Sequence, residues 1–151
     1  MAVVLGTVTV WFDRIAGRFF YPLHRALYEW TNGFIGHRTP AGPMLLLTTV
    51  GRRTGQKRTH ALLYMADGPD YVVVGSNGGR SQIPAWVLNL SATPEVGVQI
   101  GRQKLRAVAR ILTDEERTAM WPRLTAHYGG WDHYQQLTVR QLKVVSLAPS
   151  R

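Results

Sequence analysis

The sequence predicts a mainly β fold with helices, of the α+β class: a small antiparallel barrel of about six strands with helices on one side. Short apolar runs rich in Val, Leu and Thr alternate with turns that contain Gly, Asn or Asp. A few longer segments carry apolar residues at helical spacing instead. The chain has 151 residues, of which 45% are hydrophobic, so a globule with a substantial core is expected.

Residues 1–40 are predicted to form an amphipathic helix and a connector, ahead of the barrel at 41–151. Apolar side chains recur at helical spacing over residues 11–30. Pro22 should kink or divide this helix, because proline lacks an amide hydrogen. The apolar stretch at the start has no positively charged beginning and is shorter than the ~20 residues of a spanning helix. We therefore expect neither a signal peptide nor a membrane span, and a cytoplasmic protein.

One face of this N-terminal helix is basic, with Arg14, Arg18 and Arg25. Two roles remain open for the helix: packing on the barrel, or resting on an anionic membrane surface at the inner face of the cell membrane.

Strands and helices alternate along the rest of the chain. The predicted strands cover residues 44–50, 57–65, 71–75, 95–100, 104–112 and 139–147. A short helix should begin at Pro84, since proline suits the first helical turn. Thr113 and Glu116 have the spacing of a capping box, which predicts a helix from there to the glycine pair 129–130. A second short helical piece should follow over residues 131–137.

The net charge of +9 implies an anionic partner: nucleic acid, a phosphorylated cofactor or an acidic membrane. The chain has no cysteine, which excludes disulfides, thiolate nucleophiles and Cys-based metal sites. The five histidines do not pair at ligand spacing, so no metal site is expected.

The segment from Gly51 to Arg58 is the most informative part of the sequence. It places four cations, a threonine and two glycines at a predicted hairpin turn, with no acidic residue nearby. Glycines let backbone amides approach a phosphate, and the planar guanidinium of arginine matches phosphate oxygens. The residues alone allow two interpretations: a phosphate-binding turn or an ordinary solvated basic turn.

Two further groups of residues are candidates for a site. A glycine-rich loop, residues 75–80, follows the predicted buried strand and could offer its backbone to a flat ring or a phosphate, or could be an ordinary loop. Tyr128, Trp131 and Tyr134 form an aromatic group that either lines a pocket mouth or packs in the core.

Taken together, these segments resemble the deazaflavin-dependent nitroreductase family of actinobacteria, which includes quinone and enone reductases that use coenzyme F420. The resemblance is carried by residues 45–55, 78–79, 84–90, 94–96, 113–117 and 121–122, and covers about 43–147 in unbroken order. It implies a six-stranded antiparallel split β-barrel of the FMN-binding type. It also implies an oxidoreductase with a deazaflavin coenzyme lying in a groove.

The resemblance assigns roles residue by residue. The phosphate and acidic tail of the coenzyme would meet Arg52, Arg53, Thr54, Gly55 and Arg58. The ring would lie beside Ser76, Asn77 and Gly78, in a pocket shaped by Pro84, Trp86 and Asn89. The substrate would contact Leu63, Tyr128, Trp131 and Tyr134.

Some positions depart from the family pattern. Arg53 stands where lysine is common, which keeps the charge but changes the donor geometry. Leu63 and Trp131 stand where relatives often carry tyrosine. The phosphate-binding turn is intact, so the coenzyme is expected to be unchanged, but the substrate preference does not follow.

The resemblance predicts hydride transfer from the reduced deazaflavin to a small electron-poor acceptor: a quinone, an enone or a nitroaromatic ring. Tyr134, Tyr128 or Ser76 would donate a hydrogen bond or proton to the acceptor oxygen. Two rival functions remain: a split barrel that binds FMN, and a nucleic-acid-binding module motivated by the positive charge. The second predicts basic residues interleaved with exposed aromatics on one sheet. The arginines cluster at a turn instead, so no nucleic acid partner is expected.

Overall fold

A computed structural model describes residues 22–150 of the chain. The strands are β1 (Arg38–Thr39), β2 (Gly42–Val50), β3 (Lys57–Asp67), β4 (Asp70–Gly75), β5 (Glu95–Ile100), β6 (Gln103–Ile111) and β7 (Lys143–Pro149). The helices are α2 (Ala85–Ala92), α3 (Asp114–His127) and α4 (Gly130–Gln136), with a short 3-10 turn, η1, at Asn77–Gly79. Residues 22–30 are also helical.

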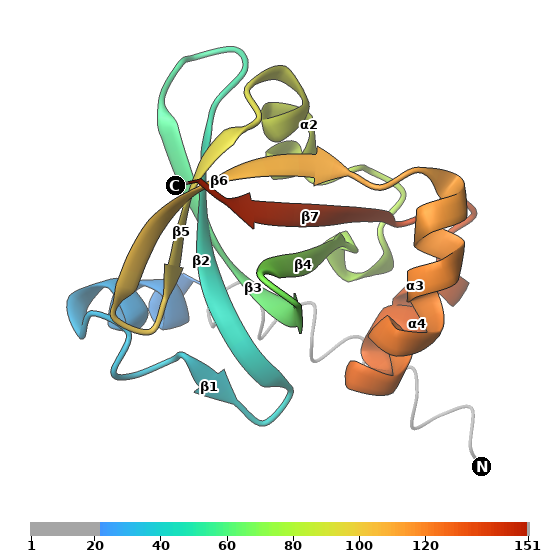
Figure 1. The fold of residues 1–151 in the computed structure, drawn as a ribbon, viewed down its shortest axis with the longest axis horizontal. Helices are drawn as coiled ribbons and strands as arrows, with labels where there is room; N and C mark the ends of the chain where they lie inside the picture. Colours follow the sequence, from blue (N-terminus) through green and yellow to red (C-terminus); the bar gives the residue numbers. More distant parts are fainter. Residues whose placement is uncertain (1–21, 151) are drawn as a thin grey trace.

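The strands form one antiparallel barrel, which confirms the predicted fold class. The strand order is β1-β2-β3-β4-β7-β6-β5, and β2 also pairs with β5, so six long strands close on themselves. The closing contact is short, with Leu47 opposite Val98. Figure 1 shows α2 near one end of the barrel, with α3 and α4 together at its side. No helix among residues 22–150 is both long and apolar enough to cross a membrane.

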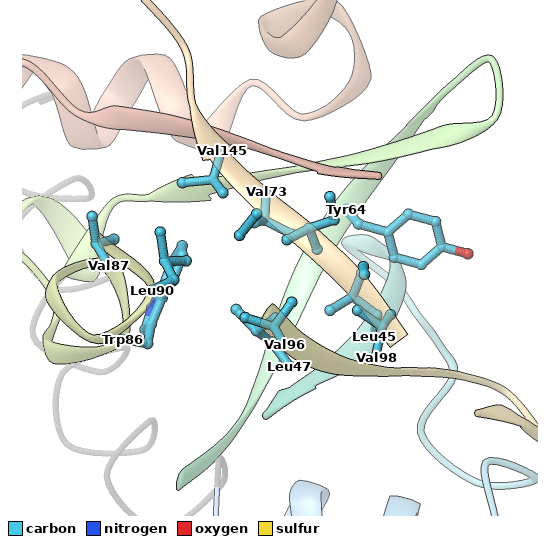
Figure 2. Packing of buried hydrophobic residues seen from close by; sticks show 13 residues of the cluster. Leu45, Leu47, Tyr64, Val73, Trp86, Val87, Leu90, Val96, Val98 and Val145 are labelled. Carbon is cyan, nitrogen blue, oxygen red and sulfur yellow. The ribbon is translucent and has the colours of Figure 1, made fainter. Parts of the chain in front are cut away.

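Two apolar clusters lie on the two faces of the sheet. Strand β4 contributes side chains to both clusters, because alternate side chains of a strand point to opposite faces. Val73 joins the barrel interior with Leu45 and Leu47, and α2 covers that interior with Trp86, Val87 and Leu90 (Figure 2). Val72 and Val74 join the second cluster, which includes Leu124 of α3 and Trp131 of α4. The predicted burial of residues 71–75 is thus confirmed for the three valines.

The helix at 22–30 packs on the barrel through Tyr28. The Tyr28 side chain is fully buried, and its hydroxyl lies 3.2 Å from the carbonyl oxygens of Met44 and Gln99. The same hydroxyl accepts a hydrogen bond from the Gly101 amide at 2.7 Å. The packing role is therefore confirmed for this part of the helix. The predicted stretch 11–21, with Arg14 and Arg18, lies outside the described residues.

The elements agree with the sequence predictions apart from two differences. The predicted capping box is confirmed: the Glu116 amide donates to the Thr113 hydroxyl, and the Glu116 carboxylate accepts from the Thr113 amide. The connector contains a two-residue strand, β1, that the sequence did not predict. The last strand begins at Lys143, so its predicted start at residue 139 was wrong. Side-chain hydrogen bonds described below hold residues 138–142 as a loop.

Candidate functional site

The basic turn between β2 and β3 is ordered by its own hydrogen bonds. The Gly51 amide donates to the Gln56 carbonyl at 2.7 Å, and the Gly55 amide donates to the Gly51 carbonyl at 2.8 Å. Gly55 has a φ of +69°, which favours glycine. The side chains of Arg52, Arg53 and Arg58 are exposed, and none is in the ion pairs formed among residues 22–150. The turn therefore presents positive charge that is paired with no carboxylate of the described residues.

A buried asparagine of α2 anchors this turn to the barrel. The Asn89 amide oxygen accepts from the backbone N–H of Arg52 at 3.2 Å and from its guanidinium at 3.3 Å. The Asn89 NH₂ group donates to the Thr49 hydroxyl at 3.3 Å. Asn89 is 4% exposed and Thr49 is fully buried. In the described structure Asn89 thus fixes the turn from beneath.

The glycine-rich loop after β4 lies between α2 and α4. Asn77, Gly78 and Gly79 have consecutive positive φ angles of 47°, 61° and 77°. A Cβ on Gly75 would lie 2.8 Å from Val87 of α2, and a Cβ on Gly79 would lie 2.9 Å from the Tyr134 carbonyl of α4. These two glycines allow the close packing. Gly78 is different, because a Cβ there would meet nothing within 4 Å, so its backbone borders open space.

Pro84 and Trp86 are buried supports for this loop. Pro84 is the N-cap of α2, where its φ of −56° suits the helix start. Trp86 is 4% exposed and packs in the barrel interior with Leu90 (Figure 2). Both residues therefore place α2 against the loop and the turn.

The predicted aromatic group surrounds the second apolar cluster. Trp131 is 3% exposed and lies edge-on to Tyr128, with 5.4 Å between the ring centroids. Tyr128, Tyr134 and Leu63 are half-buried and pack against the same cluster. Gly130 makes room for the Tyr128 ring, because any Cβ there would overlap the ring atoms.

The structure connects most of the predicted site residues in a path that crosses α2. Arg52 contacts Asn89 of α2, and α2 contacts the glycine loop at Gly75. The loop contacts α4 at Gly79, beside Tyr134. The exposed turn and the aromatic group lie at opposite ends of this path: in Figure 1 the β2–β3 turn is at the top, and α3 and α4 are at the lower right. A long molecule would be needed to contact both.

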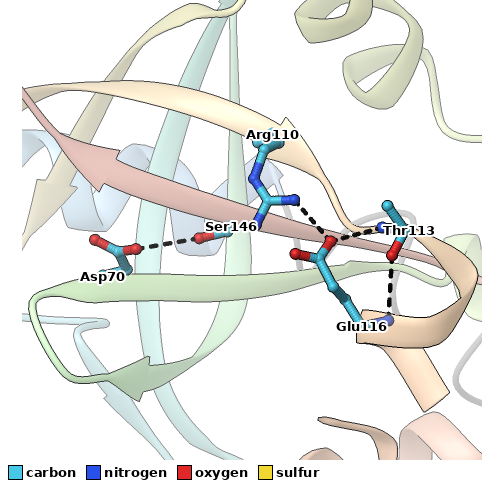
Figure 3. A network of polar contacts seen from close by, with 5 residues as sticks. All are labelled: Asp70, Arg110, Thr113, Glu116 and Ser146. Carbon is cyan, nitrogen blue, oxygen red and sulfur yellow. Dashed lines mark hydrogen bonds and ion pairs between the residues drawn. The ribbon is translucent and has the colours of Figure 1, made fainter. Parts of the chain in front are cut away.

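A surface hollow of about 370 Å³ lies elsewhere, between β4, β6, β7 and α3, and contains none of the predicted site residues. Its charges are largely paired. Arg110 and Glu116 are 2.7 Å apart, and Asp70 accepts a hydrogen bond from Ser146 (Figure 3). Arg123 and Asp67, which also line the hollow, are 3.0 Å apart. Hydrogen bonds from Arg110 and the Thr113 amide lower the pKa of Glu116 to about 2. We interpret the charged residues that line this hollow as a structural network, in which Glu116 also caps the start of α3.

Sequence reasoning missed Arg140. Its guanidinium donates hydrogen bonds to the carbonyls of Gly75, Ser76 and Arg80, at 3.1, 2.9 and 2.9 Å. Burial lowers the pKa of Arg140, but an arginine guanidinium is not deprotonated in proteins, so the group remains charged. Arg140 lies inside a predicted strand and belongs to no recognisable motif, so the sequence did not indicate it as a site residue.

An antiparallel barrel with helices against it, a basic hairpin turn and a glycine loop are the features of the small split-barrel class. Comparison with known proteins agrees with this class. The model of the F420H(2)-dependent quinone reductase family matches residues 21–149. An F420H(2)-dependent quinone reductase of Mycobacterium tuberculosis is 37% identical over 144 residues, which are 93% of this chain and 97% of that protein. The chain therefore belongs to the F420H(2)-dependent quinone reductase family.

Solved structures support the same assignment. A structure described as an F420-H2 dependent reductase matches with a TM-score of 0.63 and 35% identity, covering 70% of this chain and 93% of that one. HutZ of Vibrio cholerae, described as a heme storage protein, shares the fold at 18% identity, with a TM-score of 0.57 and 72% and 82% of the two chains covered. This second likeness shows the fold alone. The family assignment confirms the prediction of an F420H2-dependent reductase, with reduced F420 as the hydride donor.

The donor set of the site fits such a coenzyme. Exposed arginines on an anchored turn suit a phosphate and an acidic tail, because guanidinium donors bind such oxygens in charge-assisted pairs. The open space beside Gly78 lets a flat ring approach the backbone closely. The name of the matching family specifies F420H2 and not FMN, the rival cofactor.

Proposed function

We propose that the chain reduces a quinone in a groove that runs from the β2–β3 turn, along the 75–80 loop, to the aromatic residues of α3 and α4. The observation that carries this proposal is the coupling of an unneutralised arginine turn to α2 through the buried Asn89. Through this coupling the turn and the 75–80 loop, which we propose bind the phosphate and the ring, both contact the same helix. A two-electron hydride donor is the chemistry that the coenzyme supplies when it is bound.

The protein's own residues bind and orient. Arg53, Thr54, Gly55 and Arg58 hold the anionic end of the coenzyme, and Arg52 does so while tied to Asn89. Ser76, Asn77 and Gly78 border the ring, with Pro84 and Trp86 setting the position of α2 beneath it. The half-buried aromatic residues of α3 and α4 exclude water near the acceptor, which strengthens electrostatic interactions there.

A hydroxyl near the acceptor is needed, because negative charge develops on the quinone oxygen as hydride arrives. Tyr134 is our first candidate, since its backbone contacts the glycine loop at Gly79. Tyr128 and Ser76 are the alternatives. Leu63 and Trp131 contribute apolar surface toward the acceptor, Trp131 from within the core. Enones and nitroaromatic compounds share the electron-poor character of quinones and are further acceptors to test.

The decisive experiment is a titration of the purified protein with oxidised F420 and, in parallel, with FMN. Coenzyme fluorescence reports binding, and loss of reduced F420 absorbance reports turnover with a soluble quinone. We expect F420 to bind more tightly than FMN and reduced F420 to be oxidised only when quinone is present. Tight F420 binding without oxidation by any quinone, enone or nitroaromatic acceptor would indicate a coenzyme carrier and overturn the reductase proposal.

We further propose that the N-terminal segment meets an anionic membrane surface, where quinones with lipid tails are found. Support comes from its exposed apolar side chains: Leu23 is 60% exposed, Trp30 83% and Phe34 79%. Aromatic residues with this exposure are typical of interfacial helices. Arg25 contributes less than the sequence predicted, because it donates to the Thr59 carbonyl and lies 3.8 Å from Glu29.

Vesicles containing phosphatidylglycerol test this second proposal. The protein should cosediment with them at low salt and be released at high salt, because surface attraction is screened. A Trp30→Ser/Phe34→Ser variant should lose most of the binding while keeping reductase activity with a soluble quinone. Equal cosedimentation of the variant and the original protein would remove the apolar contact from the proposal.

A further inference from the structure

We propose that Arg140 is a positioning residue for the coenzyme: its guanidinium holds the 75–80 loop in the shape that receives the ring. This inference rests on the proposed function for the identity of the ligand. The three carbonyls that Arg140 contacts belong to Gly75 and Ser76, at the beginning of the 75–80 loop, and to Arg80, at its end. The contact therefore spans the whole loop.

Apart from Arg140, the loop is held by the close packing of Gly75 on α2 and of Gly79 on α4, and by hydrogen bonds within the loop. Three consecutive residues, Asn77, Gly78 and Gly79, have positive φ, which is costly for asparagine and gives glycine a large conformational freedom to lose. Within the loop, the Gly79 amide donates to the Ser76 carbonyl at 2.9 Å and the Arg80 amide to the Asn77 carbonyl at 3.2 Å. The Asn77 side-chain NH₂ group also donates to the Gln82 carbonyl at 3.1 Å. These three bonds all lie within residues 76–82, so they do not attach the loop to the barrel.

Arg140 is itself held from behind by a side-chain network. The Gln135 NH₂ group donates to the Arg140 carbonyl at 2.8 Å, and the Gln135 amide oxygen accepts from the Leu142 amide at 2.9 Å. The same oxygen accepts from Arg117 at 2.8 Å. Arg117 is 9% exposed and its guanidinium lies 4.2 Å from the centre of the Trp121 ring. The backbone at Arg140 is thus fixed relative to both α3 and α4.

The geometry requires an arginine and not merely a cation. Three carbonyls at different directions are met by three separate nitrogens of one planar group, Nε, Nη1 and Nη2. A lysine has the same charge, but its single ammonium on a flexible stem does not reproduce this fork. None of the ion pairs among residues 22–150 involves Arg140, so its role is directed at the loop backbone.

The test compares Arg140→Met and Arg140→Lys with the original protein, and uses Arg102→Met as a control that removes an exposed arginine from the β5–β6 turn. Hydrogen exchange of the coenzyme-free protein measures order in the peptide that covers residues 76–82. Fluorescence titration measures the Kd of oxidised F420. If the loss of the clamp leaves the loop in its binding shape only a tenth of the time, the Kd rises about tenfold.

We expect faster exchange in residues 76–82 and an F420 Kd raised about tenfold or more in Arg140→Met. Arg140→Lys should fall between it and the original protein, and Arg102→Met should match the original protein. The KM for F420 should rise while kcat at saturating coenzyme and the KM for quinone change little, because a loop that coenzyme binding can reorder loses affinity first. A general loss of stability would not separate these constants.

Loop exchange and coenzyme Kd within twofold of the original protein in folded Arg140→Met would overturn the inference. If Arg140→Met does not fold, Arg140→Lys decides, and wild-type behaviour of that variant overturns the requirement for the guanidinium. Failure of the original protein to bind F420 is a different result: it refutes the proposed function, which the variants do not test.

Discussion

Removing charge from Arg53 and Arg58 tests the coenzyme-binding turn most directly. Both side chains are exposed on the β2–β3 turn, and neither has a carboxylate partner among the described residues. Arg52 is less suitable for this purpose, because it also bonds Asn89 and its replacement would disturb the anchor of the turn. The double variant Arg53→Gln/Arg58→Gln removes two charges and keeps polar, although shorter, side chains.

The expected loss follows from the kind of bond involved. A hydrogen bond to a charged group contributes ~1.5–3 kcal/mol, and exposure on a turn places both arginines at the low end. Two such bonds give about 3 kcal/mol, which corresponds to roughly a hundredfold change in Kd. Solvent screening reduces this figure, so we expect an increase in the Kd of F420 of about tenfold to a hundredfold.

Fluorescence titration at two salt concentrations measures this change. The variant should also show a weaker dependence of Kd on salt, because fewer charges pair with the anionic coenzyme. A matched control, Arg102→Gln/Lys104→Gln, removes two exposed charges from the β5–β6 hairpin and should bind F420 almost normally. A Kd that is unchanged in the folded turn variant, or equally raised in the control, would refute the assignment of the turn.

Three further predictions concern chemistry and stability. Tyr134→Phe should lower kcat about tenfold or more while changing the KM for quinone less, because a bond to the developing oxyanion is strongest in the transition state; stopped-flow oxidation of reduced F420 measures this, and normal turnover would transfer the role to Tyr128 or Ser76. Thr113→Ala should lower the free energy of unfolding by about 1 kcal/mol, since it removes the N-cap of α3; urea unfolding checks it, and an unchanged midpoint contradicts it. The lowered pKa of Glu116, about 2 against an ordinary 4.5, means that its contribution to stability is complete above its ordinary pKa and is lost as the pH falls toward 2. The difference in unfolding free energy between the original protein and Glu116→Gln should therefore shrink over that range, and a difference independent of pH would refute the pairing with Arg110.

The barrel could be predicted from the sequence because turn residues mark where its strands begin and end. The turn at residues 51–56 separates two β-type runs, and in the structure those runs are β2 and β3, with Val50 opposite Lys57. The capping box at Thr113 was visible as a spacing, and the hydrogen bonds are present as predicted. Strand β1 was not predictable, because two residues carry no periodicity; they pair with Pro43 and Gly42 at the start of β2.

The site was predictable in its residue types and less so in its geometry. Charge without nearby acid marked the arginine turn, and the structure keeps those arginines exposed. The sequence did not reveal that Asn89 would be buried beneath the turn, since the bond from Arg52 joins positions 37 residues apart. Trp131 was expected over the substrate, and its burial in the core makes its proposed substrate contact dependent on the position of the Tyr128 ring, which lies edge-on to it.

The conformation of residues 138–142 explains why the contact of Arg140 with the glycine loop could not be predicted from the sequence. Valine and leucine at positions 139 and 142 resemble the start of the strand that follows, yet Val139 is fully exposed and Leu142 is fully buried in the second cluster. A strand needs neighbours for its backbone groups, and here Gln135 replaces them: its amide satisfies the Arg140 carbonyl and the Leu142 N–H. The Gln135 side chain on α4 thus makes the hydrogen bonds that a neighbouring strand would make. Arg140 therefore does not lie in a strand, and its guanidinium points toward the glycine loop. A pattern of apolar residues does not show that a side chain takes the place of a neighbouring strand. Because Gln135 holds the backbone at Arg140, replacing Gln135 should loosen the loop at 75–80, although the two are far apart in sequence and share no strand.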